Sequence, residues 1–306
     1  RVESPEDFYR CAEAFGAFQR KLADYPADTL SETIPNFHNT PWRYDNLMDA
    51  VHRNPCNRLG AVLNEVAFAK ERERFCETLE RARKNGSLPL RVTHNDTKLN
   101  NILFDEESGE AICIIDLDTV MPGYSVTDFG DSIRFGANTA AEDETDLSKV
   151  SLDLELFKVY AEGFIKGCDG SLTDTELELL PIGAIMMTLE CGMRFLTDHL
   201  EGDVYFKIHR PNHNLERARD QFALVEDMER KLPQMRKIIE EIVTNEKGET
   251  SVVTKIITET TTPGADTNKN PAGGNAASTG DATFVVVAAL VATLGCAIIV
   301  KKVSVR

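Results

Sequence analysis

The hydrophobic residues over roughly the first 240 positions recur mainly at steps of three and four, which is the spacing of amphipathic helices. One stripe near the start consists of Phe8, Cys11, Phe15, Phe18 and Leu22. Further helices are expected over about 61–83, around 157–164, from residue 173 onward and through 215–232. The pattern therefore predicts a mainly helical domain whose apolar stripes pack against one another.

One of these helices has a polar start signal. Thr173 is followed three residues later by Glu176, the spacing of a capping box, and the apolar residues Leu177, Leu179 and Leu180 come next. We expect the helix to begin directly after Thr173.

Two short β-rich runs interrupt the helical pattern. They are Ile102–Phe104 and residues 111–115, and the polar turn between them contains Gly109. This arrangement predicts a β-hairpin. Because polar residues lie directly before and after the hairpin, it is expected to support a functional site.

The residues on either side of the hairpin carry the candidate chemistry. His94, Asp96 and Asn101 fit H-x-D-x-x-x-x-N, the catalytic-loop pattern of the kinase fold, and Asp116 follows the second strand. Phosphoryl transfer needs a carboxylate that orients the attacking hydroxyl and accepts its proton, which is the role predicted for Asp96. It also needs oxygen ligands for Mg²⁺, which Asn101 and Asp116 can supply. Since the hairpin joins the two segments, the three side chains are expected to converge.

Other polar residues near this pattern have predicted supporting roles. His94 is expected to brace the loop by hydrogen bonding, and Lys98 either contacts the transferred phosphate or is a solvated lysine. Asp118 shares a strand face with the aspartate two positions before it, so it is a candidate second metal or substrate ligand, or else structural. Asp128 is expected to accept backbone N–H bonds from the loop, and Asp131 to act similarly or to cap a helix.

Two other interpretations of these residues stay open. In the first, Asp96 and Asn101 only cap turns and Asp116 only ends a strand. In the second, Cys113 to Val120 is the nucleophile strand of a haloacid-dehalogenase-type phosphatase, with Asp116 as nucleophile. That motif normally opens its domain and is followed by further strands, whereas here more than a hundred residues precede it and helices follow. It would also leave the H-x-D-x-x-x-x-N pattern unexplained.

Five stretches of the sequence carry a closer likeness to a known family. They are E-T-I-P-N-F-H-N-T at 32–40, R-V-T-H-N-D-T-K-L-N-N at 91–101, I-D-L-D-T-V-M-P-G at 115–123, D-F-G-D-S-I-R-F-G-A at 128–137 and E-C-G-M-R-F-L-T-D-H-L-E-G-D-V-Y-F at 190–206. Together they resemble the bacterial N-acetylhexosamine 1-kinases, within the aminoglycoside phosphotransferase and choline kinase-like family. The resemblance runs from about residue 1 to about residue 240.

This resemblance implies a fold, an activity and further site residues. The fold would be α+β and predominantly helical, the C-terminal lobe of a protein-kinase-like fold with a small catalytic hairpin. The activity would be ATP- and Mg²⁺-dependent transfer to the anomeric hydroxyl of an N-acetylhexosamine. Phe135, Arg194 and Tyr205 would lie in the sugar pocket. A guanidinium can hold sugar oxygens, although Arg194 could also pair with Glu190 along its helix, and Phe135 could belong to the core. Choline, homoserine or an aminoglycoside is the alternative acceptor.

The sequence also departs from that family. Its members have an N-terminal lobe that covers the nucleotide, and these 306 residues contain no G-x-G-x-x-G loop or V-A-I-K-like lysine. We expect that lobe to precede residue 1, and this chain alone to be inactive or nearly so. A non-catalytic, membrane-tethered kinase remnant is the alternative.

The composition changes after the helical region and predicts a division of the chain. Residues 1–246 would form the kinase-like lobe, with a catalytic loop at 94–101 and a metal loop at 115–118. Residues 247–281, rich in Thr, Pro, Gly, Asn and Ala, would be a flexible linker. Residues 282–300 are 19 uncharged, mostly apolar residues, which as a helix would span roughly 28 Å, close to the thickness of a bilayer core.

The predicted transmembrane helix is followed by a basic tail at 301–306. ATP chemistry favours a folded domain in the cytoplasm, attached to the membrane by this C-terminal helix. The basic tail conflicts with that orientation, because positive residues favour the cytoplasmic side. The polar stalk, apolar span and basic end also resemble a Gram-positive cell-wall sorting tail, without a clean L-P-x-T-G.

Charge and cysteine usage exclude several classes of function. The net charge is −16, with 50 acidic and 34 basic residues, and no long basic run is present. A polyanionic partner would be repelled, so nucleic-acid binding is not expected. The seven cysteines are scattered and none lies in a C-x-x-C pair, which gives no support to a zinc or thioredoxin-type site and indicates a reducing compartment.

Overall fold

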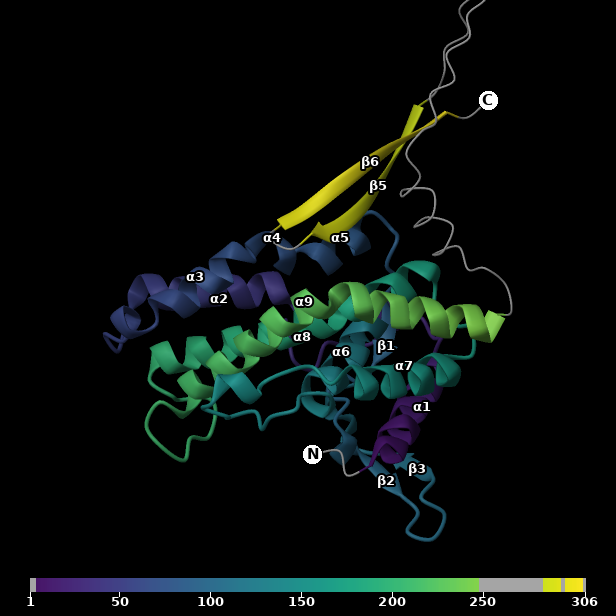
Figure 1. Cartoon of the computed structure of the whole chain (residues 1–306), viewed down its shortest axis with the longest axis horizontal. Helices are drawn as coiled ribbons and strands as arrows, with labels where there is room; N and C mark the ends of the chain where they lie inside the picture. Colours follow the sequence, from purple (N-terminus) through teal and green to yellow (C-terminus); the bar gives the residue numbers. More distant parts are fainter. Residues whose placement is uncertain (1–3, 248–282, 293–294, 305–306) are drawn as a thin grey trace, which may run out of the picture.

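The computed structural model describes residues 4–247, 283–292 and 295–304, and the fold is mostly helical with small two-stranded sheets (Figure 1). The α-helices are α1 (Pro5–Lys21), α2 (Thr40–Arg53), α3 (Leu63–Glu71), α4 (Glu73–Cys76), α5 (Thr78–Lys84), α6 (Ser125–Gly136), α7 (Leu154–Cys168), α8 (Asp174–Glu201) and α9 (His213–Lys247). The strands are β1 (Arg91–Thr93), β2 (Ile102–Phe104), β3 (Ala111–Ile114), β4 (Met121–Gly123), β5 (Thr283–Ala292) and β6 (Gly295–Ser304). Short 3₁₀ helices are η1 (Ala27–Thr29), η2 (Leu59–Ala61), η3 (Leu99–Asn101), η4 (Leu117–Thr119) and η5 (Leu147–Lys149).

The hydrophobic core lies between helices α1, α6, α7, α8 and α9, and α8 packs against α2, α6 and α9. Among the described residues, α8 is the one helix long and apolar enough for a membrane span, yet 89% of that apolar window is buried inside the fold. Its apolar residues are therefore explained by packing.

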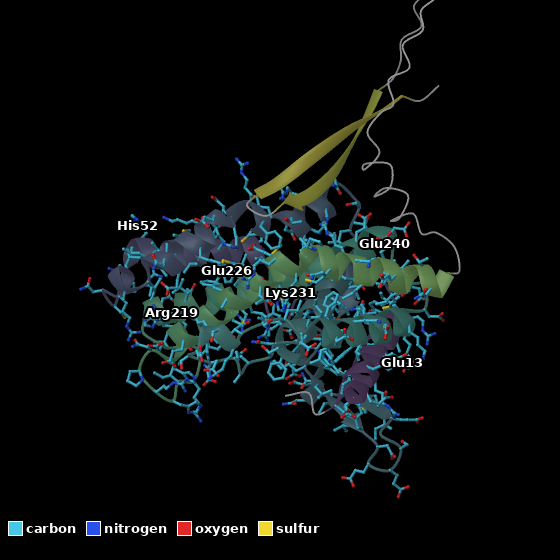
Figure 2. All side chains as sticks on the ribbon, in the orientation of Figure 1. Glu13, His52, Arg219, Glu226, Lys231 and Glu240 are labelled. Atoms are coloured by element: carbon cyan, nitrogen blue, oxygen red, sulfur yellow. The ribbon has the colours of Figure 1, made fainter. Side chains whose placement is uncertain are left out.

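In Figure 2, Lys231 of α9 lies beside the central helices, and its ammonium donates to Ser151 Oγ and Leu152 O at 2.7 Å each.

Helix α1 follows the apolar stripe predicted for it. Ser4 caps the helix by accepting a 3.0 Å hydrogen bond from the amide of Asp7. Phe8, Cys11 and Phe15 are buried, and the helix packs along α7. The predicted first helix is confirmed.

The predicted capping box at the start of α8 is also confirmed, and its glutamate has a second use. Glu176 accepts from the amide of Thr173 at 2.8 Å while its own amide donates back to the Thr173 hydroxyl at 3.2 Å. The same carboxylate accepts two hydrogen bonds from Arg91 of β1 and one from Ser125 of α6. Glu176 therefore fixes the ends of β1 and α6 against the start of the core helix.

Helices α6 and α8 cross at two glycines. A Cβ atom at Gly183 would lie 2.1 Å from Val126 O, and one at Gly130 would lie 2.3 Å from Gly183 O. Only glycine permits this backbone approach. The close crossing matters for the site because α6 carries Asp128 and Asp131.

The predicted hairpin is confirmed, and a second strand pair lies beside it. Strands β2 and β3 pair antiparallel from Ile102↔Ile114. Strands β1 and β4, which the sequence pattern did not reveal, pair from Arg91↔Gly123 to Thr93↔Met121. Each of the two predicted loops therefore leaves one ladder and enters the other, so both loops are anchored at both ends.

The prediction of a single helix over about 61–83 is wrong, because the chain bends twice and forms α3, α4 and α5. At the first bend Arg72 leaves helical geometry. Its guanidinium lies 3.5 Å from the centroid of the Phe68 ring and binds Glu229 of α9 at 2.7 Å. The contact with Glu229 spans 157 positions, so it leaves no trace in the local periodicity.

The prediction of a helix over 282–300 is also wrong, since the structure has the antiparallel strands β5 and β6 there. The segment is rich in Val and Ile, whose β-branched side chains favour strands, and an apolar run alone does not distinguish the two states. The membrane anchor inferred from that helix stays a prediction. Most of the predicted linker, residues 248–281, lies outside the described residues.

Candidate active site

The catalytic loop, residues 94–101, is held from beneath by the carboxylate of Asp128. Asp128 Oδ2 accepts the amide of His94 at 2.9 Å, and Oδ1 accepts the amide of Asn95 at 2.7 Å. Gln19 of α1 donates a third hydrogen bond at 2.6 Å. Asn95 has a left-handed φ of 65°, so the loop turns sharply here and needs this support. The contacts are those predicted for Asp128; its effect on activity stays a prediction.

His94 braces the loop in a defined tautomer. Its Nε2 lies 3.0 Å from Ile115 O, a pure acceptor, and its Nδ1 accepts the amide of Asp96 at 3.3 Å. Nε2 therefore carries the proton and the ring is neutral. The rings of Phe15 and Phe18 pack edge-on against it, with centroids at 5.4 Å and 6.0 Å. These contacts agree with the structural role predicted for His94.

The metal loop, residues 115–118, is joined to the catalytic loop through the backbone. The amide of Ile115 donates to Asn101 O at 2.9 Å. The Thr119 hydroxyl donates to His94 O at 2.7 Å, and the Asn95 side chain donates to Thr119 O at 2.9 Å. The two loops therefore lie directly against each other, as the hairpin predicted.

Asp96 sits between an amide and an ammonium. Asn101 Nδ2 lies 3.0 Å from Asp96 Oδ2 and 2.8 Å from Asp96 O. Lys98 Nζ lies 2.6 Å from Asp96 Oδ1. Burial lowers the pKa of Lys98, but the hydrogen bond to Asp96 and the charge of Asp131 outweigh burial, and the pKa is raised. Lys98 therefore stays charged, so the carboxylate of Asp96 faces a permanent positive charge.

The predicted metal ligands differ in how they are held. Both hydrogen bonds of Asn101 Nδ2 go to Asp96, which leaves its amide oxygen as the atom to face a cation. Asp116 has a left-handed φ of 61° and an exposed side chain, one position after the backbone bond to Asn101. Asp118 is exposed in η4, and its carbonyl accepts from the Thr33 hydroxyl at 3.0 Å.

The donor chemistry of this set fits Mg²⁺, because a carboxylate and an amide oxygen are hard ligands and Mg²⁺ keeps water and phosphate oxygens as its remaining ligands. Asn101 and Asp116 are the residues that would hold the ion. Within the described ranges, no group of three or more His, Cys, Asp and Glu side chains forms a metal-binding cluster.

Two of the three predicted sugar-binding residues line one cavity, and the third does not. A cavity of about 320 Å³ between α2 and the end of α8 is lined by Arg194 and Tyr205 together with Arg43. Phe135 is half-buried on α6 and does not line this cavity. Its predicted role in the pocket therefore has no geometric support here.

Arg194 does not form the helical ion pair with Glu190 that was the alternative. The carboxylate of Glu190 instead binds His38 Nδ1 at 2.9 Å and the Thr40 hydroxyl at 2.6 Å. The guanidinium of Arg194 lies 5.8 Å from the centroid of the Phe37 ring. Its positive charge only contributes to lowering the pKa of Glu190, against the effect of burial.

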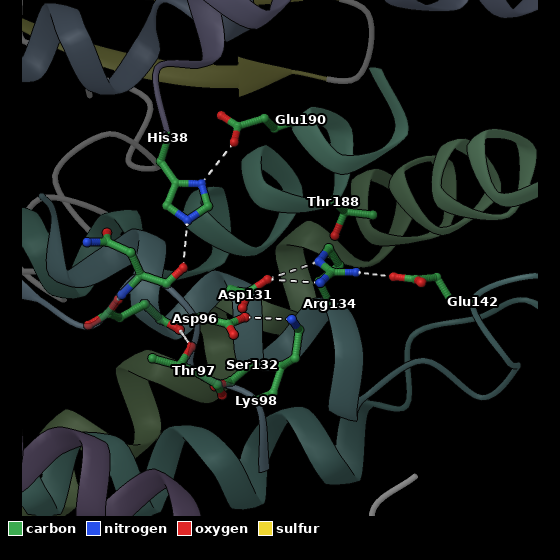
Figure 3. A network of polar contacts seen from close by, with 12 residues as sticks. His38, Asp96, Thr97, Lys98, Asp131, Ser132, Arg134, Glu142, Thr188 and Glu190 are labelled. Carbon is green, nitrogen blue, oxygen red and sulfur yellow. Dashed lines mark hydrogen bonds and ion pairs between the residues drawn. The ribbon is translucent and has the colours of Figure 1, made fainter. Parts of the chain in front are cut away.

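A contact that was not predicted joins α8 to the catalytic loop through a histidine (Figure 3). His38 Nδ1 binds Glu190, and its Nε2 lies 3.0 Å from Asn95 O, next to Asp96. In the sequence, residues 32–40 and 190–206 are distinguished only by their likeness to the N-acetylhexosamine 1-kinases. His38 and Glu190 are 152 positions apart in the sequence, so the local spacing of residues does not reveal their contact.

A second buried network supports the same loop from α6 (Figure 3). The Arg134 guanidinium binds Asp131 Oδ1 at 3.0 Å and Glu142 Oε1 at 2.8 Å. Burial raises the pKa of Asp131, but the charges of Arg134, His38 and Lys98 outweigh it and the pKa is lowered. Asp131 is therefore a negative charge that acts on Lys98, and its hydrogen bonds within the described chain come from the Arg134 side chain and not, as expected, from backbone amides of the loop or of a helix end.

Comparison with known proteins finds one family whose model matches the part of the chain that contains these loops. Residues 1–151 match the model of the phosphotransferase enzyme family, APH. The matched region contains both loops and the two ladders that hold them.

Two solved structures are similar at low identity. The choline kinase from Cryptosporidium parvum Iowa II has 13% identity and a TM-score of 0.47, and the match covers 78% of this chain and 68% of that chain. The Plasmodium vivax ethanolamine kinase has 14% identity and a TM-score of 0.43, with 70% and 60% covered. Both scores lie below 0.5, so we derive nothing about the acceptor from these two proteins.

Proposed function

We propose that this chain carries the catalytic and acceptor-binding part of a small-molecule kinase that transfers a phosphoryl group from ATP to a hydroxyl group. Two contacts support the proposal. Asn101 donates a hydrogen bond to Asp96 within the catalytic loop, and the backbone of that loop is hydrogen-bonded to the metal loop that contains Asp116. In this proposal Asp96 accepts the proton of the attacking hydroxyl, and Asn101 and Asp116 hold Mg²⁺, which bridges and neutralises the transferring phosphates.

The other residues of the loop act on Asp96 and on charge. Lys98 lies 2.6 Å from Asp96 and is placed to exchange that partner for an oxygen of the transferred phosphoryl group. His94 and Asp128 keep the loop in place through the hydrogen bonds described above. Catalysis would then depend mainly on positioning and electrostatic stabilisation, as is general for phosphoryl transfer.

For the acceptor we propose an N-acetylhexosamine phosphorylated at its anomeric hydroxyl. The support is the likeness of five sequence stretches to N-acetylhexosamine 1-kinases, together with the shared cavity of Arg194 and Tyr205. Tyr205 is 73% exposed, so its ring is free to cover a ligand. A cavity of about 320 Å³ is within the size range of small-ligand sites.

Product formation tests the proposal. The full chain is incubated for hours with ATP, Mg²⁺ and N-acetylglucosamine or N-acetylgalactosamine, and the anomeric phosphate is detected by ³¹P NMR. Since this chain alone is expected to be nearly inactive, we expect only a trace of product from the parent chain over these hours, none after chelation of Mg²⁺, and less than the parent forms from Asp96→Asn. Equal product with Asp96→Asn would refute the role of Asp96. Product from choline but not from either sugar would refute the acceptor while leaving the kinase class intact.

A further inference from the structure

The cavity between α2 and α8 holds both signs of charge, but its carboxylates are already engaged. Asp49 and Glu201 both bind the guanidinium of Arg53. Asp198 accepts the amides of residues 204, 205 and 206 and the side chain of Asn214, with distances of 2.8 to 3.0 Å. The negative groups that line the cavity therefore serve the protein itself.

The two remaining arginines of the cavity are not engaged in the same way. Within the described part of the chain, neither Arg43 nor Arg194 forms an ion pair with a carboxylate. Arg43 donates one hydrogen bond to Phe37 O at 2.9 Å, and its Nε is buried without a hydrogen-bond partner. Arg194 has ring contacts only, to Phe37 and Phe206.

These two guanidinium groups also repel each other. Burial and the positive charge of Arg194 together lower the pKa of Arg43, although Glu190 and Tyr205 act in the opposite direction. Like charges at one cavity cost free energy unless a counter-charge joins them. Both guanidinium groups line one cavity and neither has a carboxylate partner among the described residues, so an oxyanion bound there would offset their repulsion.

We infer that Arg43 and Arg194 form an oxyanion-binding subsite, which takes the carboxylate or phosphate group of a small molecule entering the cavity. Each guanidinium offers a planar fork of N–H donors that matches the paired oxygens of these groups. A neutral hydroxyl would leave the repulsion between the arginines in place, and a cationic ligand would add to it. The inference rests on the proposed function in treating the cavity as the acceptor side, and it narrows the proposed acceptor to a sugar that carries an acidic group in addition to its reacting hydroxyl.

The sole tryptophan gives a direct readout of this subsite. The Arg43 guanidinium lies 4.9 Å from the centroid of the Trp42 ring, and the chain has one Trp. We would titrate the full chain with N-acetylglucosamine 6-phosphate, glucuronate and N-acetylglucosamine, following Trp42 fluorescence and the heat of binding by calorimetry. The subsite predicts that at least one acidic sugar binds about 10-fold or more tightly than the neutral sugar, and that added salt weakens the binding. Comparing the phosphate with the carboxylate identifies the source of the oxyanion.

Substitutions locate the binding and separate it from catalysis. Arg43→Ala and Arg194→Gln should each weaken the acidic ligand about 10-fold or more. Arg20→Ala on α1 removes the same charge outside the cavity, where Arg20 pairs with Asp169, and should leave the affinity within about 2-fold. Since Arg43 also bonds Phe37 O, the Arg194→Gln variant and a thermal melt of each variant guard against loss of fold.

Asp96→Asn distinguishes the two proposals, because it should abolish transfer and leave oxyanion binding unchanged. Product formed equally by the parent chain and by Asp96→Asn would refute the role of Asp96 and leave the subsite intact. Equal affinity of the parent chain for acidic and neutral sugars would overturn the subsite. So would an affinity for the acidic sugar that decreases equally in Arg20→Ala and Arg194→Gln.

Discussion

His38 Nδ1 and Glu190 share a part-buried hydrogen bond of 2.9 Å, and Nε2 of the same imidazole binds Asn95 O at 3.0 Å. A carboxylate and a carbonyl can only accept, so both ring nitrogens must carry protons and His38 is an imidazolium. The pKa values agree with this geometry. Burial lowers the pKa of His38, but Glu190 outweighs burial and the pKa is raised. The result is a charged link from the core helix α8 to the residue before Asp96.

Replacing His38 by Gln should destabilise the protein strongly, because it leaves the carboxylate of Glu190 buried without its charged partner. The expected loss is about 3 kcal/mol in the free energy of unfolding, measured by urea denaturation. The double variant His38→Gln with Glu190→Gln removes the uncompensated charge and should recover a substantial part of that loss. If the double variant is as unstable as the sum of the two single variants, the pair is not coupled.

The same pair gives stability a pH dependence of known sign. Since the pKa of His38 is raised in the folded state, its contribution is fully present below the unfolded value of about 6.5 and is lost as the pH rises through the folded pKa. The unfolding free energy of the parent chain should therefore fall on the alkaline side of about pH 6.5. That fall should be reduced in His38→Gln, whereas an identical pH profile in both proteins would contradict the charged link.

Asp220 on α9 provides a second pH effect at lower pH. Burial raises its pKa to about 7, against the lowering effect of hydrogen bonds from Gln221 and Asn138. The folded pKa lies above the unfolded value, so stability from the protonated acid is present below about pH 4 and is lost as the pH rises through about 7. One such group gives a slope of at most about 1.4 kcal/mol per pH unit. Asp220→Asn should remove this slope between about pH 4 and pH 7, measured by thermal and urea unfolding; an unchanged slope would exclude Asp220 as its source.

Asp128 should control the order of the catalytic loop more than the stability of the whole domain. It accepts the amides of His94 and Asn95, and Asp128→Ala would leave both donors unpaired in a buried position at a cost of about 1–3 kcal/mol each. We expect faster amide hydrogen exchange at these two residues, with exchange in the middle of α8 changed much less. Product formation should fall together with the loop protection. Uniform acceleration across the domain would instead mean that Asp128 acts through global stability.

The local elements of this fold could be predicted from the sequence because their signals are local. The α1 stripe, the capping box of α8 and the hairpin β2–β3 depend on residues within a few positions of one another, and each is confirmed. The catalytic loop was found for the same reason, since its pattern fits within eight residues. The apolar run at 282–300 is the counterexample. It satisfies the length rule for a helix, while its β-branched residues fit the strands that the structure has.

The rest of the site depends on partners far apart in the chain. His38 meets Glu190 across 152 positions, and Gln19 meets Asp128 across 109. Strand β1 meets β4 only because the intervening loops fold back. The oxyanion subsite could not be predicted from local sequence either, because Arg43 and Arg194 come from different helices. The subsite becomes apparent only when the structure shows that both line one cavity without carboxylate partners. Local periodicity carries no information on such pairs.

The crossing of α6 and α8 offers a test in which two effects of opposite sign compete. Gly183 lies in the interior of α8, where replacing Gly by Ala normally gains about 1 kcal/mol in helix stability. Here the added Cβ would lie 2.1 Å from Val126 O, a backbone atom that cannot rotate away. Separating the helices costs more than the gain, so Gly183→Ala should lower the unfolding free energy by about 1–3 kcal/mol. Gly60 in η2 is the matched control, since a Cβ there would meet nothing within 4 Å, and Gly60→Ala should be neutral or slightly stabilising. Urea unfolding of both variants decides the matter: a stabilised Gly183→Ala protein would mean that α6 and α8 do not approach as closely as described.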